Sequence, residues 1–172
     1  MLTAVILNRL KGDAAIFIET GTWNGAGCLT ALEVGFQRVI SIERSMACYR
    51  YARRRFAEDP RVALHWGDSA HMLGSVLAGI SERAVIWLDA HRVPGVPDSH
   101  DSFPLGAELH ALSVAPYRQH TILIDDVDLA GTQLLPGLTQ LQIRDALQRI
   151  NPAYAMWLED VGERCGSILV AT

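Results

Sequence analysis

The chain has 172 residues, of which 49% are hydrophobic and 20% charged, and its formal net charge is −4. This composition is that of a globular protein, and the length fits one domain, residues 1–172, that can bury roughly 70% of its unfolded surface. The negative net charge argues against broad electrostatic binding to nucleic acid, so no nucleic-acid partner is expected.

The N-terminal segment "MLTAVILNRLKGD" predicts an ordinary helix. Its apolar run is too short to span a membrane, and it lacks the basic start and the cleavage site of a signal peptide. The three cysteines, Cys28, Cys48 and Cys165, are odd in number and form no CxxC pair. This usage is typical of a reducing compartment, so a cytoplasmic protein without a membrane partner is expected.

Residues 16–25, "IFIETGTWNG", predict a strand, a loop and the start of a helix. The apolar stretch Ala14–Ile18 has the length and the β-branched content of a strand buried on both faces. The following helix has apolar residues at helical spacing, and Gly35 can cap its C-terminus. Gly21 and Gly25 in the loop suggest that something approaches the backbone closely there.

The rest of the chain alternates between strand and helix patterns. The expected strands are Ala15–Glu19, Arg38–Glu43, Val62–Trp66, Ala84–Asp89, Thr121–Asp125, Tyr154–Glu159 and Ser167–Ala171, and the expected helices include Met46–Ala57, His71–Ile80, one that starts at Pro104 and one that ends at Ile150. This alternation predicts an α/β fold with a single doubly wound, mostly parallel sheet. Only the short turn "DVGERCG" separates the last two strands, which should therefore form an antiparallel hairpin.

Two further segments have open interpretations. The irregular stretch Arg92–Phe103 is long for a loop, and we expect it to be mobile without ligand and to order over an acceptor. The run Arg53-Arg54-Arg55 is either the solvated face of a helix or a contact for phosphate or RNA. The tryptophans Trp66, Trp87 and Trp157 follow strand patterns and are expected in the core.

Acidic residues end or follow each of the first five strands. They are Glu19, Glu43, Asp68, Asp89 and the pair Asp125 and Asp126. Open parallel sheets bind ligands beyond the carboxyl ends of their strands. Any one of these acids could simply cap the next helix, but the whole row favours a ligand site.

The spacing of the glycines bears on which ligand this is. An acid about 20 residues after a glycine turn can bind a ribose diol, and Glu43 fits that role. Gly21, Gly25 and Gly27 do not follow G-x-G-x-x-G, however, and Glu19 would repel a pyrophosphate. A nucleoside with an amino-acid tail and a sulfonium suits these residues better than a dinucleotide.

The motifs "FIETGTWNG", "ISIE", "GDS", "WLDAH" and "ILIDD", in this order, resemble class I S-adenosylmethionine-dependent methyltransferases, in particular the macrocin O-methyltransferase group. The resemblance covers roughly Ile16 to Asp126 and implies the strand order 3-2-1-4-5-7-6. It also implies a site for the cofactor S-adenosylmethionine. Glu19, Gly21 and Gly25 would line the methionine part, Glu43 would hold the ribose, Asp68 with Ser69 would bind the adenine, and Thr22 and Trp23 complete the predicted site.

The same resemblance implies a divalent metal held by Asp89, Asp125 and Asp126. Carboxylates that converge would otherwise raise one another's pKa values, and an all-oxygen set favours Mg²⁺. Asp89 or His91 could then accept a proton from the acceptor hydroxyl, although a histidine at this position often only binds a neighbouring loop.

The first hypothesis is therefore a Mg²⁺-dependent O-methyltransferase that acts on a small hydroxylated molecule. Three alternatives stay open: a metal-independent methyltransferase, a catalytically silent nucleoside-binding or partner-binding module, and an NAD-dependent oxidoreductase, which the glycine spacing disfavours. A homodimer also stays open.

Overall fold

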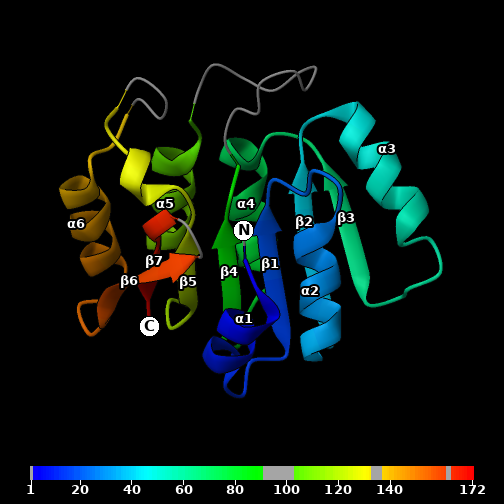
Figure 1. Cartoon of the computed structure of the whole chain (residues 1–172), viewed down its shortest axis with the longest axis horizontal. Coiled ribbons are helices and arrows are strands. Elements are labelled where there is room, and N and C mark those ends of the chain that lie inside the picture. Colours follow the sequence, from blue (N-terminus) through cyan, green and yellow to red (C-terminus); the bar gives the residue numbers. More distant parts are fainter. Residues whose placement is uncertain (1, 91–102, 133–136, 162–163) are drawn as a thin grey trace.

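The computed structural model describes residues 2–90, 103–132, 137–161 and 164–172 (Figure 1). His91 and the predicted loop, apart from Phe103, lie outside this range. The helices are α1 (Ala4–Lys11), α2 (Ala26–Val34), α3 (Met46–Arg55), α4 (Ser69–Ala78), α5 (Leu105–Val114), the short 3₁₀ helix η1 (Val127–Leu129) and α6 (Gln140–Ile150). The strands are β1 (Ile16–Thr20), β2 (Arg38–Glu43), β3 (Val62–Trp66), β4 (Ala84–Leu88), β5 (Thr121–Ile124), β6 (Met156–Val161) and β7 (Arg164–Ala171).

The seven strands form one sheet in the order β3-β2-β1-β4-β5-β7-β6, which is the order that the resemblance to class I methyltransferases implies. Strands β1 to β5 pair in parallel, and β7 pairs antiparallel with both β5 and β6. The predicted α/β fold with its C-terminal hairpin is therefore confirmed. The carboxyl ends of β1 to β5 consequently lie along one edge of the sheet, which we call the carboxyl edge (Figure 1).

Helices cover both faces of the sheet. Isoleucines of β1, β2 and β4 pack with α4, α5 and α6 in one core layer, whereas Phe17, Val39 and Trp87 pack with α1, α2 and α3 in the other. Both layers are needed because the central strands are apolar on both faces. Along the described ranges, no helix is long and apolar enough to cross a membrane.

The helix ends follow local sequence signals. Thr3 and Ser45 accept hydrogen bonds from backbone N–H groups in the first turns of α1 and α3, and a capping box of Thr139 and Gln142 starts α6. Gly35 ends α2 in the left-handed conformation, as predicted.

Two details differ from the sequence-based expectation. β6, Met156–Val161, begins and ends two residues later than expected, and β7, Arg164–Ala171, begins three residues earlier, so both strands extend into the segment expected to be a turn. Trp87 is in the core, but Trp66 is 54% exposed. The expectation for Trp66 was wrong because β3 is the edge strand, where a neighbour on one side is missing.

Candidate functional site

The loop after β1 approaches other backbone segments so closely that it requires glycine. Gly21 has φ +83°, and a Cβ there would lie 2.6 Å from the carbonyl oxygen of Asp89 at the end of β4. Gly25 has φ +79°, and its Cβ would lie 2.6 Å from the Phe56 ring. Gly21 therefore lets the loop approach the carboxyl end of β4, and Gly25 lets it pack against Phe56 at the end of α3.

Glu43, at the end of β2, holds this loop in place. Its carboxylate oxygens accept hydrogen bonds from the backbone N–H of Trp23 at 2.7 Å and of Ser45 at 2.6 Å. Burial raises the pKa of Glu43, and these backbone donors partly oppose the shift. Trp23 itself has φ +47° and is 47% exposed. The predicted ribose-binding acid and the predicted loop tryptophan are thus in direct contact.

Glu19 lies beneath the loop and not on the open edge. Its carboxyl group is buried and accepts hydrogen bonds from Ser41 Oγ at 2.7 Å and from Cys28 Sγ at 3.1 Å. The Thr22 hydroxyl, also buried, contacts Ser41 and extends this chain of polar groups. A Cβ on Gly27 would overlap Glu19 Oε1, at 1.8 Å. Gly27 is therefore required in the first turn of α2 because the acid occupies the space beside it.

Burial raises the pKa of Glu19 to about 8, partly offset by the hydrogen bonds from Ser41 and Cys28. The carboxyl group of Glu19 is therefore mostly protonated at neutral pH. Glu19 is therefore not the exposed charge expected from the sequence, and it does not present a negative charge that would repel a phosphate.

Asp68 and Ser69 start α4 beside the end of β3. Asp68 is the N-cap of α4 and accepts a hydrogen bond from Ala70 N at 2.9 Å, and Arg44 forms an ion pair with it at 3.2 Å. Asp68 thus has the capping role that the sequence analysis kept as an alternative, at a position that still borders the carboxyl edge. Ser69 is buried.

The ends of β4 and β5 bring Asp89 and Asp125 close together. The strands are paired up to Leu88 and Ile124, and the backbone N–H of Asp125 donates to Leu88 O. Burial, followed by the charge of Asp89, raises the pKa of Asp125 to about 6. The Trp87 indole N–H donates to Asp89 Oδ2 at 3.2 Å.

Asp126 differs from these two acids. It has φ +49°, and its backbone N–H donates to Asp125 Oδ1 at 2.9 Å. Among the residues that the structure describes, no group of three or more His, Cys, Asp or Glu side chains is arranged to hold a metal ion. Asp89, Asp125 and Asp126 therefore do not fit the predicted three-carboxylate Mg²⁺ site in this structure.

Sequence reasoning missed Glu108, which lies on α5 among apolar residues. Glu108 is 1% exposed, and its Oε1 atom has no hydrogen-bond partner within the described part of the chain. Burial raises the pKa of Glu108 to about 7, and the nearby hydroxyls of Ser69 and Thr20 offset part of this shift. The available signal was spacing, because Glu108 falls on the same helical face as Leu105, Leu109 and Leu112.

No protein-family model and no curated protein matches the chain. Solved structures do match it. The O-methyltransferase from Bacillus cereus in complex with SAH has a TM-score of 0.67 at 16% identity, over 98% of this chain and 78% of that protein. CalS10, an amino pentose methyltransferase from Micromonospora echinaspora solved with SAM, has a TM-score of 0.65 at 16% identity, over 98% and 87%. The SAH-bound methyltransferase PaMTH1 from Podospora anserina has a TM-score of 0.61 at 16% identity, over 98% and 76%.

Identities this low establish the fold alone. The narrower resemblance to the macrocin O-methyltransferase group stays a prediction. The strand order and the antiparallel β5-β7-β6 end are shared with these neighbours, and the chain therefore has the class I methyltransferase fold.

Proposed function

We propose that the protein is an S-adenosylmethionine-dependent methyltransferase that methylates a hydroxyl group of a small molecule. The observation that carries the proposal is the position of Glu43. Its partly desolvated carboxyl group lies at the carboxyl edge and is held by the glycine loop. The fold supports the proposal, because methyltransferases solved with SAM or SAH share it.

The residues at this edge fit the cofactor. The Glu43 carboxylate accepts backbone N–H groups of Trp23 and Ser45, and an ionised carboxylate has about four lone-pair positions with which it can also bind the hydroxyls of a ribose. Trp23, exposed on the loop, offers an apolar surface beside that position. When bound, S-adenosylmethionine supplies a methyl group whose carbon–sulfur bond breaks with its electrons left on sulfur.

Asp125, with Asp89 beside it, removes the proton from the acceptor hydroxyl. The acceptor oxygen loses its proton as it bonds to the methyl carbon, and Asp125 accepts that proton. A carboxyl group with a pKa of about 6 is mostly ionised at neutral pH and is more basic than an ordinary aspartate. Burial is the main cause of this raised pKa, and the charge of neighbouring Asp89 adds to it. Asp89 and His91, the two bases expected from the sequence, stay alternatives to Asp125, and His91 lies outside the described residues.

Mg²⁺ dependence is a separate prediction, and no step above depends on it. The test treats an active preparation with EDTA and then adds Mg²⁺. Transfer that is lost and then restored would support a metal at Asp89 and Asp125, completed by groups other than Asp126. Transfer that persists in EDTA would support proton transfer to the carboxylate alone.

The decisive experiment is calorimetry with S-adenosylhomocysteine and with NAD. We expect binding of the first and none of the second. Preference for NAD would overturn the proposal. Binding of S-adenosylhomocysteine without methyl transfer to any of a panel of hydroxylated acceptors would instead favour a silent nucleoside-binding module.

A further inference from the structure

Helix α3 carries a concentration of positive charge that the proposed function does not use. Six of the fifteen lysine and arginine residues lie between positions 44 and 61, although the whole chain is negative. The helix itself, "MACYRYARRR", has four arginines and no acid. It lies at the β3 end of the sheet, the right-hand end in Figure 1.

The arginines of α3 are mostly without carboxylate neighbours. Within the described ranges, Arg50, Arg53 and Arg54 have no ion-pair partner, and all three are exposed. Arg50 is three residues from Arg53 and four from Arg54, and like charges at these spacings destabilise a helix by about 0.2–0.5 kcal/mol per pair. Cations in a last helical turn interact favourably with the helix dipole, which accounts for Arg53 to Arg55 but not for Arg50.

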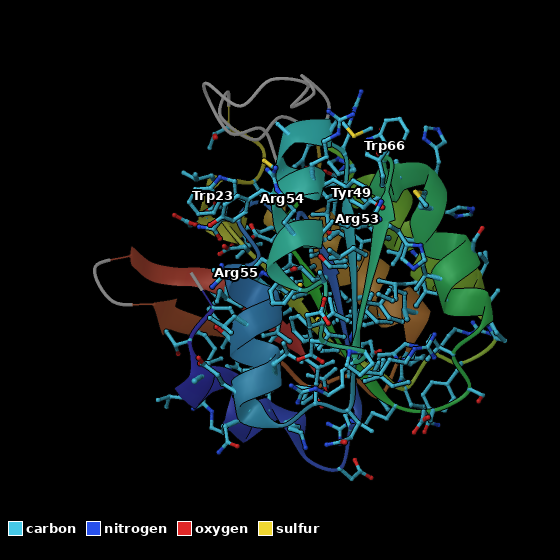
Figure 2. The ribbon with its side chains drawn as sticks, turned by 90° about the vertical axis from the view of Figure 1, so that its right-hand side faces the viewer. Trp23, Tyr49, Arg53, Arg54, Arg55 and Trp66 are labelled. Carbon is cyan, nitrogen blue, oxygen red and sulfur yellow. The ribbon has the colours of Figure 1, made fainter. Side chains whose placement is uncertain are left out.

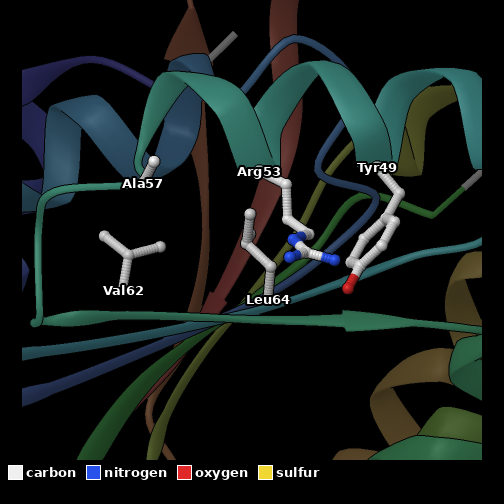
Figure 3. Close-up of a pocket in the computed structure, with 5 residues that line it drawn as sticks. All are labelled: Tyr49, Arg53, Ala57, Val62 and Leu64. Atoms are coloured by element: carbon white, nitrogen blue, oxygen red, sulfur yellow. The ribbon is translucent and has the colours of Figure 1, made fainter.

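A groove of about 290 Å³ separates α3 from the edge strand β3. Figure 3 shows Tyr49 and Arg53 pointing from α3 toward β3, where Val62 and Leu64 form the opposite wall. The groove thus combines the apolar wall of Val62 and Leu64 with the guanidinium group of Arg53 and the phenol of Tyr49. An aromatic or heterocyclic ring can lie against this wall while an anionic group contacts Arg53.

Trp66 continues the line of Val62 and Leu64 along the same face of β3, because side chains alternate along a strand. Its indole N–H donates to the backbone carbonyl of Arg44 at 3.1 Å, which fixes the ring, and yet the side chain is 54% exposed. Trp23 is exposed on the other side of α3, so that two tryptophans flank the arginine-rich helix (Figure 2). The exposed face of a ring held in this way can stack on another ring.

We propose that α3 and β3 form a docking surface for single-stranded nucleic acid, with phosphates on Arg50, Arg53 and Arg54 and a base stacked on Trp66. Proteins that bind single strands combine a positive groove along the backbone with aromatic side chains that stack on bases. An acidic protein segment would match the arginines but would leave the exposed indole face without a stacking partner. The groove and the arginines do not include Glu43 or Asp125, although Trp66 pairs with Glu43 between β3 and β2. The inference does not rest on the proposed function.

The test measures binding of fluorescently labelled 12-nucleotide oligo-U and oligo-dT to the full chain by anisotropy, without cofactor, across a salt series. Oligo-U and oligo-dT distinguish RNA from DNA as the source of the strand. A duplex of equal length, poly-glutamate and anionic phospholipid vesicles serve as competitors. We expect a single strand to bind, the duplex to compete poorly, and poly-glutamate and vesicles not to compete.

Two variants then locate the site. Trp66→Ala should weaken binding roughly fivefold to a hundredfold, the range for loss of one stacked base. Arg50→Ala with Arg54→Ala should reduce the slope of log affinity against log salt by about 1.4, the value for two lost phosphate contacts on a single strand. The matched control is Arg118→Ala with Arg149→Ala, which removes two exposed arginines elsewhere on the molecule and should leave both quantities unchanged.

Several outcomes would overturn the inference. They are no binding at 50 mM salt, an equal loss in the control double variant, a Trp66→Ala protein that binds normally, and competition by poly-glutamate or vesicles as strong as that by the single strand. Concentration-dependent dimerisation that is abolished by Trp66→Ala would assign the surface to a second copy of the chain. Circular dichroism on each variant confirms folding, which is expected to persist because all the substituted side chains are exposed or partly exposed.

Discussion

The acids at the ends of β2 and β3 have different neighbours from those at the ends of β4 and β5. Glu43 accepts two backbone N–H groups, and Asp68 caps α4 and pairs with Arg44. Asp125 instead lies next to another carboxylate, Asp89, which helps to raise its pKa. Acidic residues along one edge can therefore hold a ligand or accept a proton, and the groups beside each acid decide which.

The largest expected effect concerns proton transfer. Asp125→Asn should reduce kcat by about 10²–10⁴-fold, the usual contribution of a general base, and leave S-adenosylhomocysteine affinity within twofold. The wild-type kcat/KM should rise with pH through about 6 and then level off, because Asp125 is inactive when protonated. Steady-state kinetics and calorimetry check both parts.

Asp128→Asn, the same change at an exposed position on η1, is the matched control and should retain activity. If Asp125→Asn weakens cofactor binding as much as it slows turnover, the assignment of proton transfer to the acids of β4 and β5 and of ligand binding to those of β2 and β3 is wrong.

The second effect concerns stability and pH at Glu19. The pKa of Glu19 is about 8 in the folded protein and 4.5 in the unfolded chain. Between pH 4.5 and about 8, the folded state therefore keeps a proton on Glu19 that the unfolded state has lost. Stability should therefore fall as pH rises from about 5 to 8, by at most about 1.4 kcal/mol per pH unit from this group. Glu19→Gln, which cannot ionise, should remove that slope.

Urea unfolding of wild type and Glu19→Gln at pH 5, 6, 7 and 8 measures the difference. Glu33→Gln on the exposed side of α2 is the control and should keep the wild-type slope. Parallel curves for wild type and Glu19→Gln would mean that Glu19 is already ionised in the folded protein at neutral pH.

The third effect concerns cofactor affinity. Glu43→Ala removes the acceptor for the ribose hydroxyls and also releases Trp23 N, so S-adenosylhomocysteine should bind about 1.5–3 kcal/mol more weakly, roughly ten- to hundredfold. Glu58→Ala, an exposed acid beyond α3, should have no effect. Unchanged affinity in a folded Glu43→Ala protein would mean that Glu43 only fixes the loop.

The smallest effect separates capping from recognition at Asp68. Asp68→Ala should cost about 1 kcal/mol of stability through the lost N-cap, while Asp68→Asn, which still caps, should cost only a few tenths. If Asp68 also contacts adenine through its charge, both variants should weaken S-adenosylhomocysteine binding by less than Glu43→Ala does. Normal binding by both would leave Asp68 with the capping role alone.

Much of the fold could be predicted because its signals are local. Apolar runs of strand length alternate with helical spacing, and β2 and β3 begin and end at the predicted residues. The short segment between β6 and β7 indicated the hairpin in the same way. A parallel sheet then places the acids along one edge without further information.

The unpredicted features depend on neighbours that are distant in sequence. Glu19 and Gly27 are eight positions apart, yet only the packing of α2 on β1 shows that the carboxyl group fills the space where Gly27 lacks a Cβ. Trp66 looks like a core residue by strand pattern, and its exposure follows from the position of β3 at the sheet edge. Glu108 lies on the apolar face of a helix, so a pattern of acids at strand ends does not include it.

The contact between Cys28 and Glu19 has a practical consequence for measuring motion. Cys28 is buried, and burial raises the pKa of its thiol, so a labelling reagent meets neither an accessible sulfur nor a thiolate in the closed protein. In a variant with Cys48→Ser and Cys165→Ser, the rate of thiol modification would therefore report how often α2 separates from β1. The glycine loop leads into α2, so a ligand that binds beside this loop should slow the modification.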